Sequence, residues 1–169
     1  CLAELNEMIG RKADSSNLGV EQSTLNETIK DITSTRSNPL ISSCGLTAQY
    51  AIMMGLVDFA KENFSQKPIH FIVPPNCYGG TNDQARRVAA CIESVEIIDL
   101  AVDSGKDMVS ELEKILDQSA AIDAVPYIIA EIPTNPRVEV PDLISLNKTL
   151  KEKRTNKNDE EATPPVFIL

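Results

Sequence analysis

The sequence predicts an α/β protein: a mainly parallel sheet in a three-layer arrangement, with helices on both faces. Short apolar runs suited to buried strands alternate with longer segments whose apolar residues recur at helical spacing. This alternation is typical of a parallel sheet covered by helices. The chain has 169 residues, 42% of them hydrophobic and 24% charged, which is enough for a domain with its own core.

Five short apolar stretches are expected to be strands. They cover residues 39–41, 69–73, 95–100, 125–132 and 166–169. The first is very short. The fourth contains Pro126, which we expect at the start of its strand because proline lacks a backbone donor for the sheet.

Residues 2–9 are expected to be a short helical stretch and residues 104–106 a turn. Five longer segments are expected to be helices. They cover residues 21–35, 48–63, 82–91 and 108–116, and a segment that Pro141 opens from a position where proline is tolerated. The helix at 48–63 is apolar around most of its girth, so we expect it to be buried between the sheet and a partner subunit. Thr81 and Gln84 have capping-box spacing and are expected to fix the start of the helix at 82–91.

The predicted domain organisation is simple. Residues 1–39 form an N-terminal helical segment, and residues 40–169 form a partial α/β domain. Residues 154–163, rich in Asn, Lys, Asp and Glu, are expected to be a solvated, mobile loop. The chain starts without methionine and its last residues read as an interrupted strand, so we expect a fragment of a longer polypeptide.

Charge and cysteine content argue against several classes of partner. The formal net charge of -9 disfavours nucleic acid and anionic membrane surfaces. No apolar run is long enough to span a bilayer and no signal segment is visible, so a cytoplasmic location is expected. With no CxxC pair and one histidine, we predict no metal site. Cys44 and Cys77 are expected to be small buried thiols, and His70 a strand residue rather than a base.

Three loops carry the residue types of a ligand site. Residues 42–45 (Ser-Ser-Cys-Gly) precede a helix, where backbone amides can bind an anion such as phosphate or merely cap the helix. Residues 74–81 join a buried strand to a helix and present Tyr78, either as a flat ligand platform or as a packed tyrosine in a tight turn. Asn135 lies between two prolines after a strand; its amide can donate and accept hydrogen bonds, or it belongs to a plain Asn-Pro turn.

Together these loops resemble one family. Residues 43–48, Ser-Cys-Gly-Leu-Thr-Ala, are similar to its Ser-Ser-Gly-Met-Ala-Ala loop, and residues 78–81 match its Tyr-Gly-Gly-Thr. Residues 131–136 match its Glu-x-Pro-Ser/Thr-Asn-Pro, and Asp142 falls where it carries a later aspartate. The order and spacing agree over residues 40–169. The family is the Cys/Met-metabolism group of pyridoxal-phosphate (PLP) enzymes: cystathionine γ-synthase, cystathionine β-lyase, cystathionine γ-lyase and methionine γ-lyase.

The resemblance implies the large-domain fold of a type I PLP-dependent transferase and a specific chemistry. The reaction would be elimination or replacement at the β or γ carbon of a sulfur amino acid or an activated homoserine, in a homodimer or homotetramer. Gly45 and Leu46 would give backbone N–H bonds to the phosphate of pyridoxal 5'-phosphate. Tyr78 would stack on the pyridine ring, and its catalytic part would be in proton transfer or leaving-group departure. Asn135 would reach the cofactor's phenolic oxygen or the substrate carboxylate, and Glu131 is held as structural.

The sequence also departs from the family. Leu46 replaces a methionine, a harmless change because the contact is through backbone. The Tyr-x-Arg arm, the Schiff-base lysine and the aspartate that pairs with the pyridine nitrogen are not found, so this segment alone is expected to be inactive. Residues 151–164 resemble an insertion.

Two other functions stay open. One is a non-catalytic α/β binding or assembly module that holds no PLP. The other is a Rossmann-like domain for a different phosphate ligand, which would need an acidic ribose-binding residue about 20 residues beyond its phosphate loop. That distance beyond Gly45 falls near Glu62, at the exposed end of the predicted helix.

Overall fold

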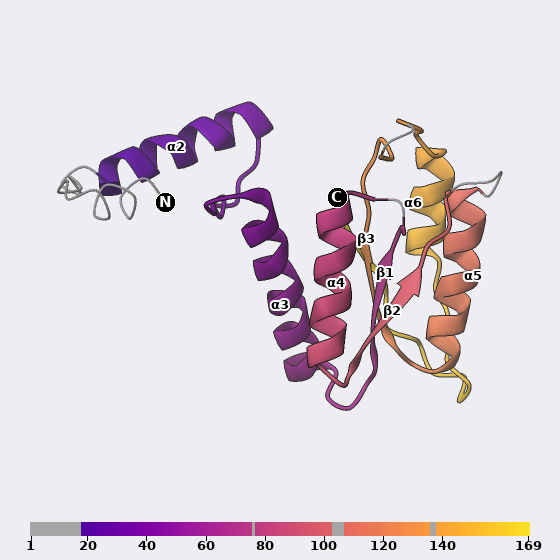
Figure 1. The fold of residues 1–169 in the computed structure, drawn as a ribbon. Coiled ribbons are helices and arrows are strands. Elements are labelled where there is room, and N and C mark those ends of the chain that lie inside the picture. Colours follow the sequence, from indigo (N-terminus) through magenta and orange to yellow (C-terminus); the bar gives the residue numbers. More distant parts are fainter. Residues whose placement is uncertain (1–17, 76, 103–106, 136–137) are drawn as a thin grey trace. The chain divides into compact units, whose positions relative to one another are not determined.

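The structure is a computed structural model that describes residues 18–75, 77–102, 107–135 and 138–169 (Figure 1). The chain divides into two compact units, Cys1–Ala48 and Gln49–Leu169, and each is described by itself. The observed division falls inside a helix, whereas the sequence suggested a division at residues 39 and 40. The short helical stretch expected at residues 2–9 and the turn expected at residues 104–106 lie outside the described residues.

The first unit contains helix α2 (Leu18–Thr33) and the first turn of helix α3 (Gly45–Asn63). The helix predicted at 21–35 is confirmed, but its apolar residues Leu25 and Ile32 are 47% and 78% exposed. The very short strand predicted at 39–41 is wrong. This stretch has no regular structure, and Leu40 is 99% exposed, so no burial stabilises a strand there.

The second unit is built on a four-stranded sheet in which every strand pair is parallel. The strands are β1 (Ile69–Val73), β2 (Val95–Asp99), β3 (Val125–Ile129) and β4 (Val166–Ile168), in the order β2-β1-β3-β4. Four of the five predicted strands are therefore confirmed, and so is the α/β class. Pro126 is the second residue of β3, so it lies near the start of the strand, as expected.

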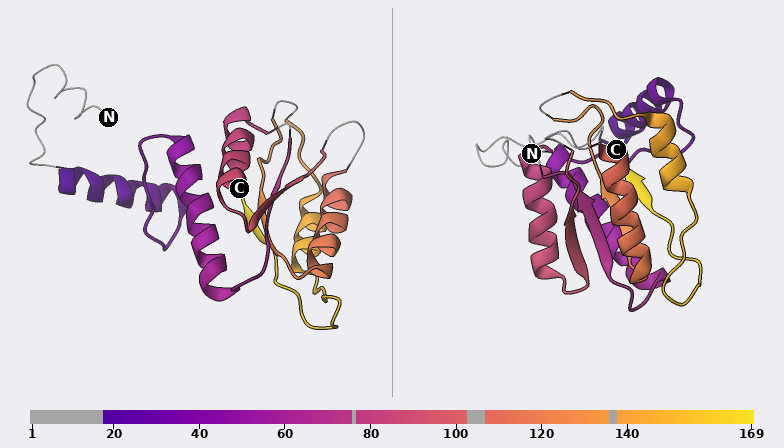
Figure 2. Two further views of the ribbon diagram at one scale, coloured as in Figure 1. Left: turned by 60° about the horizontal axis from the view of Figure 1, so that its bottom comes forward. Right: turned by 90° about the vertical axis from the view of Figure 1, so that its right-hand side faces the viewer.

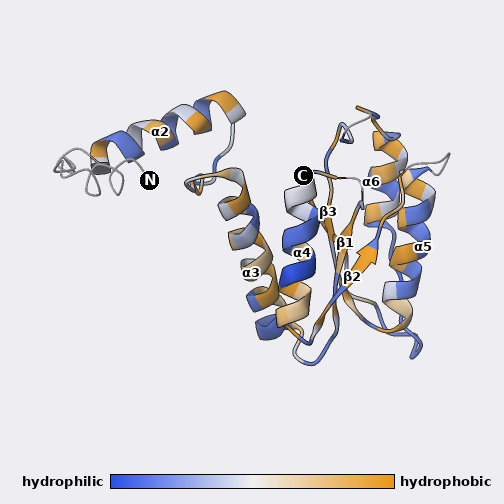
Figure 3. Cartoon of the chain, in the orientation of Figure 1, coloured by the Kyte–Doolittle hydropathy of each residue, from blue (hydrophilic) through white to orange (hydrophobic). Residues whose placement is uncertain are grey.

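Helices cover both faces of this sheet (Figures 1 and 2). On one face, α3 and α4 (Gly79–Cys91) pack on alternate strand residues. This core includes Met53, Val57, Phe71, Ala85, Val88 and Tyr127. On the other face lie α5 (Met108–Ala121) and α6 (Leu143–Lys151). That core includes Ile72, Leu112, Leu116, Ile128 and Leu146. Successive side chains of a strand point to opposite faces of the sheet, so the apolar strands β1 and β3 contribute buried residues to both cores (Figure 3).

Helix α3 is less buried than predicted. Met53, Val57 and Ala60 are buried against the sheet. Tyr50, Ile52 and Phe59 are between 43% and 50% exposed, although the sequence predicted burial around most of the helix. Within the described residues, no helix combines the length and the apolar character that crossing a lipid bilayer requires.

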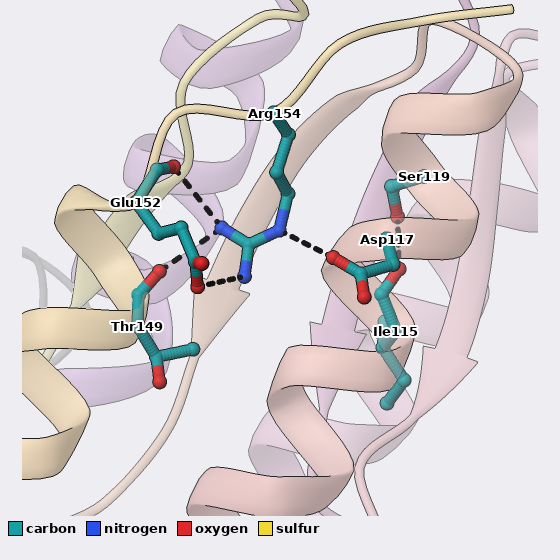
Figure 4. A network of polar contacts seen from close by, with 6 residues as sticks. All are labelled: Ile115, Asp117, Ser119, Thr149, Glu152 and Arg154. Carbon is teal, nitrogen blue, oxygen red and sulfur yellow. Dashed lines mark hydrogen bonds and ion pairs between the residues drawn. The ribbon is translucent and has the colours of Figure 1, made fainter.

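The segment after α6 is not the fully solvated loop that its composition predicted. Thr155 and Glu161 form an antiparallel β-bridge, and Asn156 and Ala162 are buried. The Arg154 side chain is only 10% exposed. Its guanidinium donates to Asp117 Oδ1 at 2.7 Å and to the carbonyl oxygens of Thr149 and Glu152 at 3.0 and 3.2 Å (Figure 4). Arg154 thus ties this segment to α5 and to the end of α6.

His70 is a buried strand residue, as predicted. Its Nδ1 lies 2.8 Å from Ser119 Oγ, which itself donates to the carbonyl of Ile115. Since that hydroxyl proton is engaged, Nδ1 carries the proton and donates to Ser119. Burial lowers the pKa of His70, partly offset by the charge of Glu96.

Candidate functional site

The candidate site lies at the carboxyl edge of the sheet, where β1 and β3 are neighbours. The chain leaves β1 toward α4 on one face and leaves β3 toward α6 on the other. Two adjacent loops that depart to opposite faces define the switch point at which open α/β sheets bind ligands. The loop after β1 carries Tyr78, and the loop after β3 carries Glu131 and Asn135.

Tyr78 stands directly before α4 with its side chain 52% exposed. Helix α4 begins at Gly79, so it starts earlier than the predicted residue 82. A Cβ added at Gly79 would meet no heavy atom within 4 Å, which leaves open space beside the tyrosine. The ring is therefore available as a flat surface at the switch point.

The predicted capping box at the start of α4 is wrong. The residue at the helix cap is Tyr78, and no side chain caps the helix locally. Thr81 is buried and its hydroxyl donates to Gln49 Oε1 of α3 at 3.1 Å. Thr81 therefore lies inside the helix, and its hydroxyl bonds to a neighbouring element instead of capping the helix.

Glu131 reaches across the switch point to the tyrosine loop. Its Oε1 accepts a hydrogen bond from the backbone N–H of Tyr78 at 3.1 Å, between residues 53 positions apart. Two of the three predicted ligand loops are therefore joined. The sequence held Glu131 as structural without naming a partner, because no local pattern connects it to Tyr78.

Cys77 lies buried beneath this contact, as the sequence predicted. Burial and the nearby charge of Glu131 raise the pKa of its thiol to about 11. The Sγ atom lies 3.6 Å from the carbonyl oxygen of Tyr78. Cys77 is consequently a neutral packing residue at physiological pH and not a nucleophile.

Asn135 lies exposed at the tip of a tight loop. Thr134, which is buried, closes this loop: its N–H donates to the carbonyl of Glu139 at 2.9 Å, and its hydroxyl accepts from the N–H of Glu139 at 3.1 Å. Val138 adopts a φ of 57°, a left-handed conformation that is uncommon for a β-branched residue. Pro136 lies outside the described residues.

Asp142 caps α6. Its carboxylate accepts from the N–H groups of Ile144 and Ser145 at 3.0 and 3.3 Å and from the Ser145 hydroxyl at 2.7 Å. These bonds, led by that of the Ser145 hydroxyl, lower the pKa of Asp142. Pro141 therefore precedes the cap and does not open the helix, a correction to the prediction. The aspartate's role here is to start the helix.

Gly45 and Leu46 form the first turn of α3, in the first unit. The N–H of Ala48 donates to the carbonyl of Cys44, so the amides of Gly45 and Leu46 precede the first bond of the helix. A Cβ added at Gly45 would meet no heavy atom within 4 Å. Such a helix start can bind an anion or be capped by a side chain, the two alternatives that the sequence left open.

Cys44 is exposed, which contradicts the predicted burial. Hydrogen bonds lower the pKa of its thiol, first from the Thr47 hydroxyl, at 3.2 Å, then from the backbone N–H groups of Thr47 and Leu46. The thiol thus occupies the place of a helix-capping side chain. Its anionic form is favoured because it faces the positive end of the helix.

In the second unit, Tyr78 presents an exposed aromatic ring; in the first unit, the amides of Gly45 and Leu46 lie at a helix start beside the Cys44 thiol. No group of three or more His, Cys, Asp or Glu side chains in the described parts of the chain could hold a metal ion. No protein-family model matches the chain, and no curated protein matches it at a significant level. The resemblance to the PLP enzymes therefore stays a prediction carried by the motifs.

Proposed function

We propose that residues 40–169 form the cofactor-binding part of a PLP-dependent enzyme that performs elimination or replacement at the β or γ carbon of a sulfur amino acid or an activated homoserine. The observation that supports it is the contact of Tyr78 with Glu131, because it joins two motifs of the resemblance at the switch point. Without this contact, nothing in the second unit would bring the two motifs together.

Each residue then has a defined part. Within the second unit, the Tyr78 ring would stack on the pyridine ring and the Asn135 amide would orient the phenolic oxygen or the substrate carboxylate. In the first unit, the amides of Gly45 and Leu46 would bind the phosphate, a role that rests on the resemblance. The cofactor, when bound, supplies the electron sink for the α-carbon. The resemblance also requires a Schiff-base lysine and an aspartate that this sequence lacks at matching positions.

The test is cofactor binding by the complete gene product. PLP is titrated while its absorbance is followed, with pyridoxal as the ligand that lacks the phosphate. We expect Tyr78→Ala to weaken PLP binding about three- to tenfold through loss of stacking, and Tyr78→Phe to retain it. Tyr50→Ala is the matched control, because Tyr50 is 49% exposed on α3 and lies outside the three motifs.

The same measurement separates the rival function. Ile52 and Phe59 are seven residues apart on α3, so they share one helix face, and both side chains are partly exposed. Such an apolar face suits a partner surface, which favours a non-catalytic assembly module as the second candidate. A complete gene product that stays colourless with PLP and converts no amino acid would support that candidate and refute the enzyme.

A further inference from the structure

We infer that Glu131 is a positioning residue that fixes the backbone of the tyrosine loop, so that the ring of Tyr78 is presented at the switch point. The inference concerns the site of the proposed function and rests on it for the identity of the ligand. The latch, meaning the bond from Tyr78 N–H to Glu131 Oε1, does not depend on the identity of the ligand.

The start of α4 needs such a partner. Its first turn holds no acidic residue, and no side chain of its own caps it. A helix start favours a negative charge nearby because its first N–H groups are unpaired and carry partial positive charge. Glu131, at the end of β3, supplies this charge from another element, next to Tyr78 and directly before the helix.

A second anchor holds the other side of the loop. Asn82 donates from Nδ2 to the carbonyl of Pro74 at 3.3 Å, and Arg86 binds Asn82 Oδ1 at 2.7 Å and Asp99 Oδ1 at 2.6 Å. This chain ties the beginning of the loop to α4 and to the end of β2. With Glu131 on the β3 side, the backbone that carries Tyr78 is held from both neighbouring strands.

The negative charge of Glu131 also acts on Cys77, the residue before Tyr78. It is the second cause, after burial, that raises the pKa of the Cys77 thiol to about 11. The carboxylate therefore lies close to both residues of the loop, the buried thiol and the exposed tyrosine.

The latch is tested by amide hydrogen exchange at Tyr78 in the full chain. Glu131→Ala removes the acceptor, and we expect the Tyr78 amide to exchange about tenfold faster, as for loss of one charge-assisted bond. Glu131→Gln keeps an acceptor oxygen and should exchange within about threefold of wild type. Glu139→Ala, an exposed carboxylate after the same strand, is the control and should leave Tyr78 unchanged.

The positioning role is tested by a double-mutant cycle on PLP affinity. We expect Glu131→Ala to weaken binding in the wild-type background but to have less than about a twofold effect when Tyr78 is already alanine. A merely structural residue would weaken binding equally in both. Equal effects, or Tyr78 exchange within about twofold of wild type in Glu131→Ala, would overturn the inference. If wild type binds no PLP, the proposed function fails, and the exchange result still decides the latch.

Discussion

Replacing Arg154 with alanine should strongly destabilise the second unit, although Arg154 lies in a segment whose composition suggests a solvated loop. The side chain is 10% exposed and donates to Asp117 and to two backbone carbonyls at the end of α6. Removing it leaves those carbonyls without their charged donor and enlarges the cavity that Arg154 lines together with Leu116, Ala120 and Leu150.

The magnitude follows from three contributions. A hydrogen bond to a charged group contributes about 1.5–3 kcal/mol, and the buried methylenes contribute about 0.8 kcal/mol each. The ion pair with Asp117 adds at most about 1 kcal/mol, because that carboxylate is 64% exposed. Burying the guanidinium offsets part of this sum. We expect a net loss of about 3 kcal/mol, a large share of the stability of a small domain.

Urea unfolding measures this loss. With a slope of about 2 kcal/mol per molar urea, the midpoint should fall by about 1.5 M in Arg154→Ala. Lys153→Ala is the control: Lys153 is the preceding residue, 81% exposed, and pairs with Glu161, which is 65% exposed, so its loss should cost less than about 1 kcal/mol. Arg154→Lys should lie between them, because an ammonium lacks the fork that reaches Asp117 and the carbonyls together. An Arg154→Ala midpoint within about 0.3 M of Lys153→Ala would refute the reasoning.

Two further predictions concern buried and exposed polar groups. Iodoacetamide labelling, read by mass spectrometry, should modify Cys44 at a lower pH than Cys77. The reason is that hydrogen bonds lower the pKa of Cys44, while burial raises that of Cys77 to about 11. Equal labelling of both thiols in the folded protein would contradict the structure. Tyr127→Phe should leave the free energy of unfolding unchanged or raise it by up to about 1 kcal/mol, since the hydroxyl is buried and has no hydrogen-bond partner within the described residues. A loss larger than about 1 kcal/mol in chemical unfolding would show that the hydroxyl is bonded.

The sequence alone determined the class and the local elements. Apolar runs and helical spacing predicted four of the strands and the helices around them, and β1 has the predicted bounds. Such patterns depend on residues a few positions apart, so the secondary structure of each segment can be predicted from that segment alone. The burial of Cys77 and the strand position of His70 followed from the same local reasoning.

The tertiary structure decided which side chains meet. Nothing in the chain beside Glu131 indicates that its partner is the amide of Tyr78, because this depends on β1 and β3 becoming neighbours. The Thr81 hydroxyl bonds to Gln49 of another helix, and Arg154 binds Asp117, which is distant in sequence. Strand order and the burial of each polar residue arise from the packing of the whole sheet, and a local pattern of polarity does not encode them.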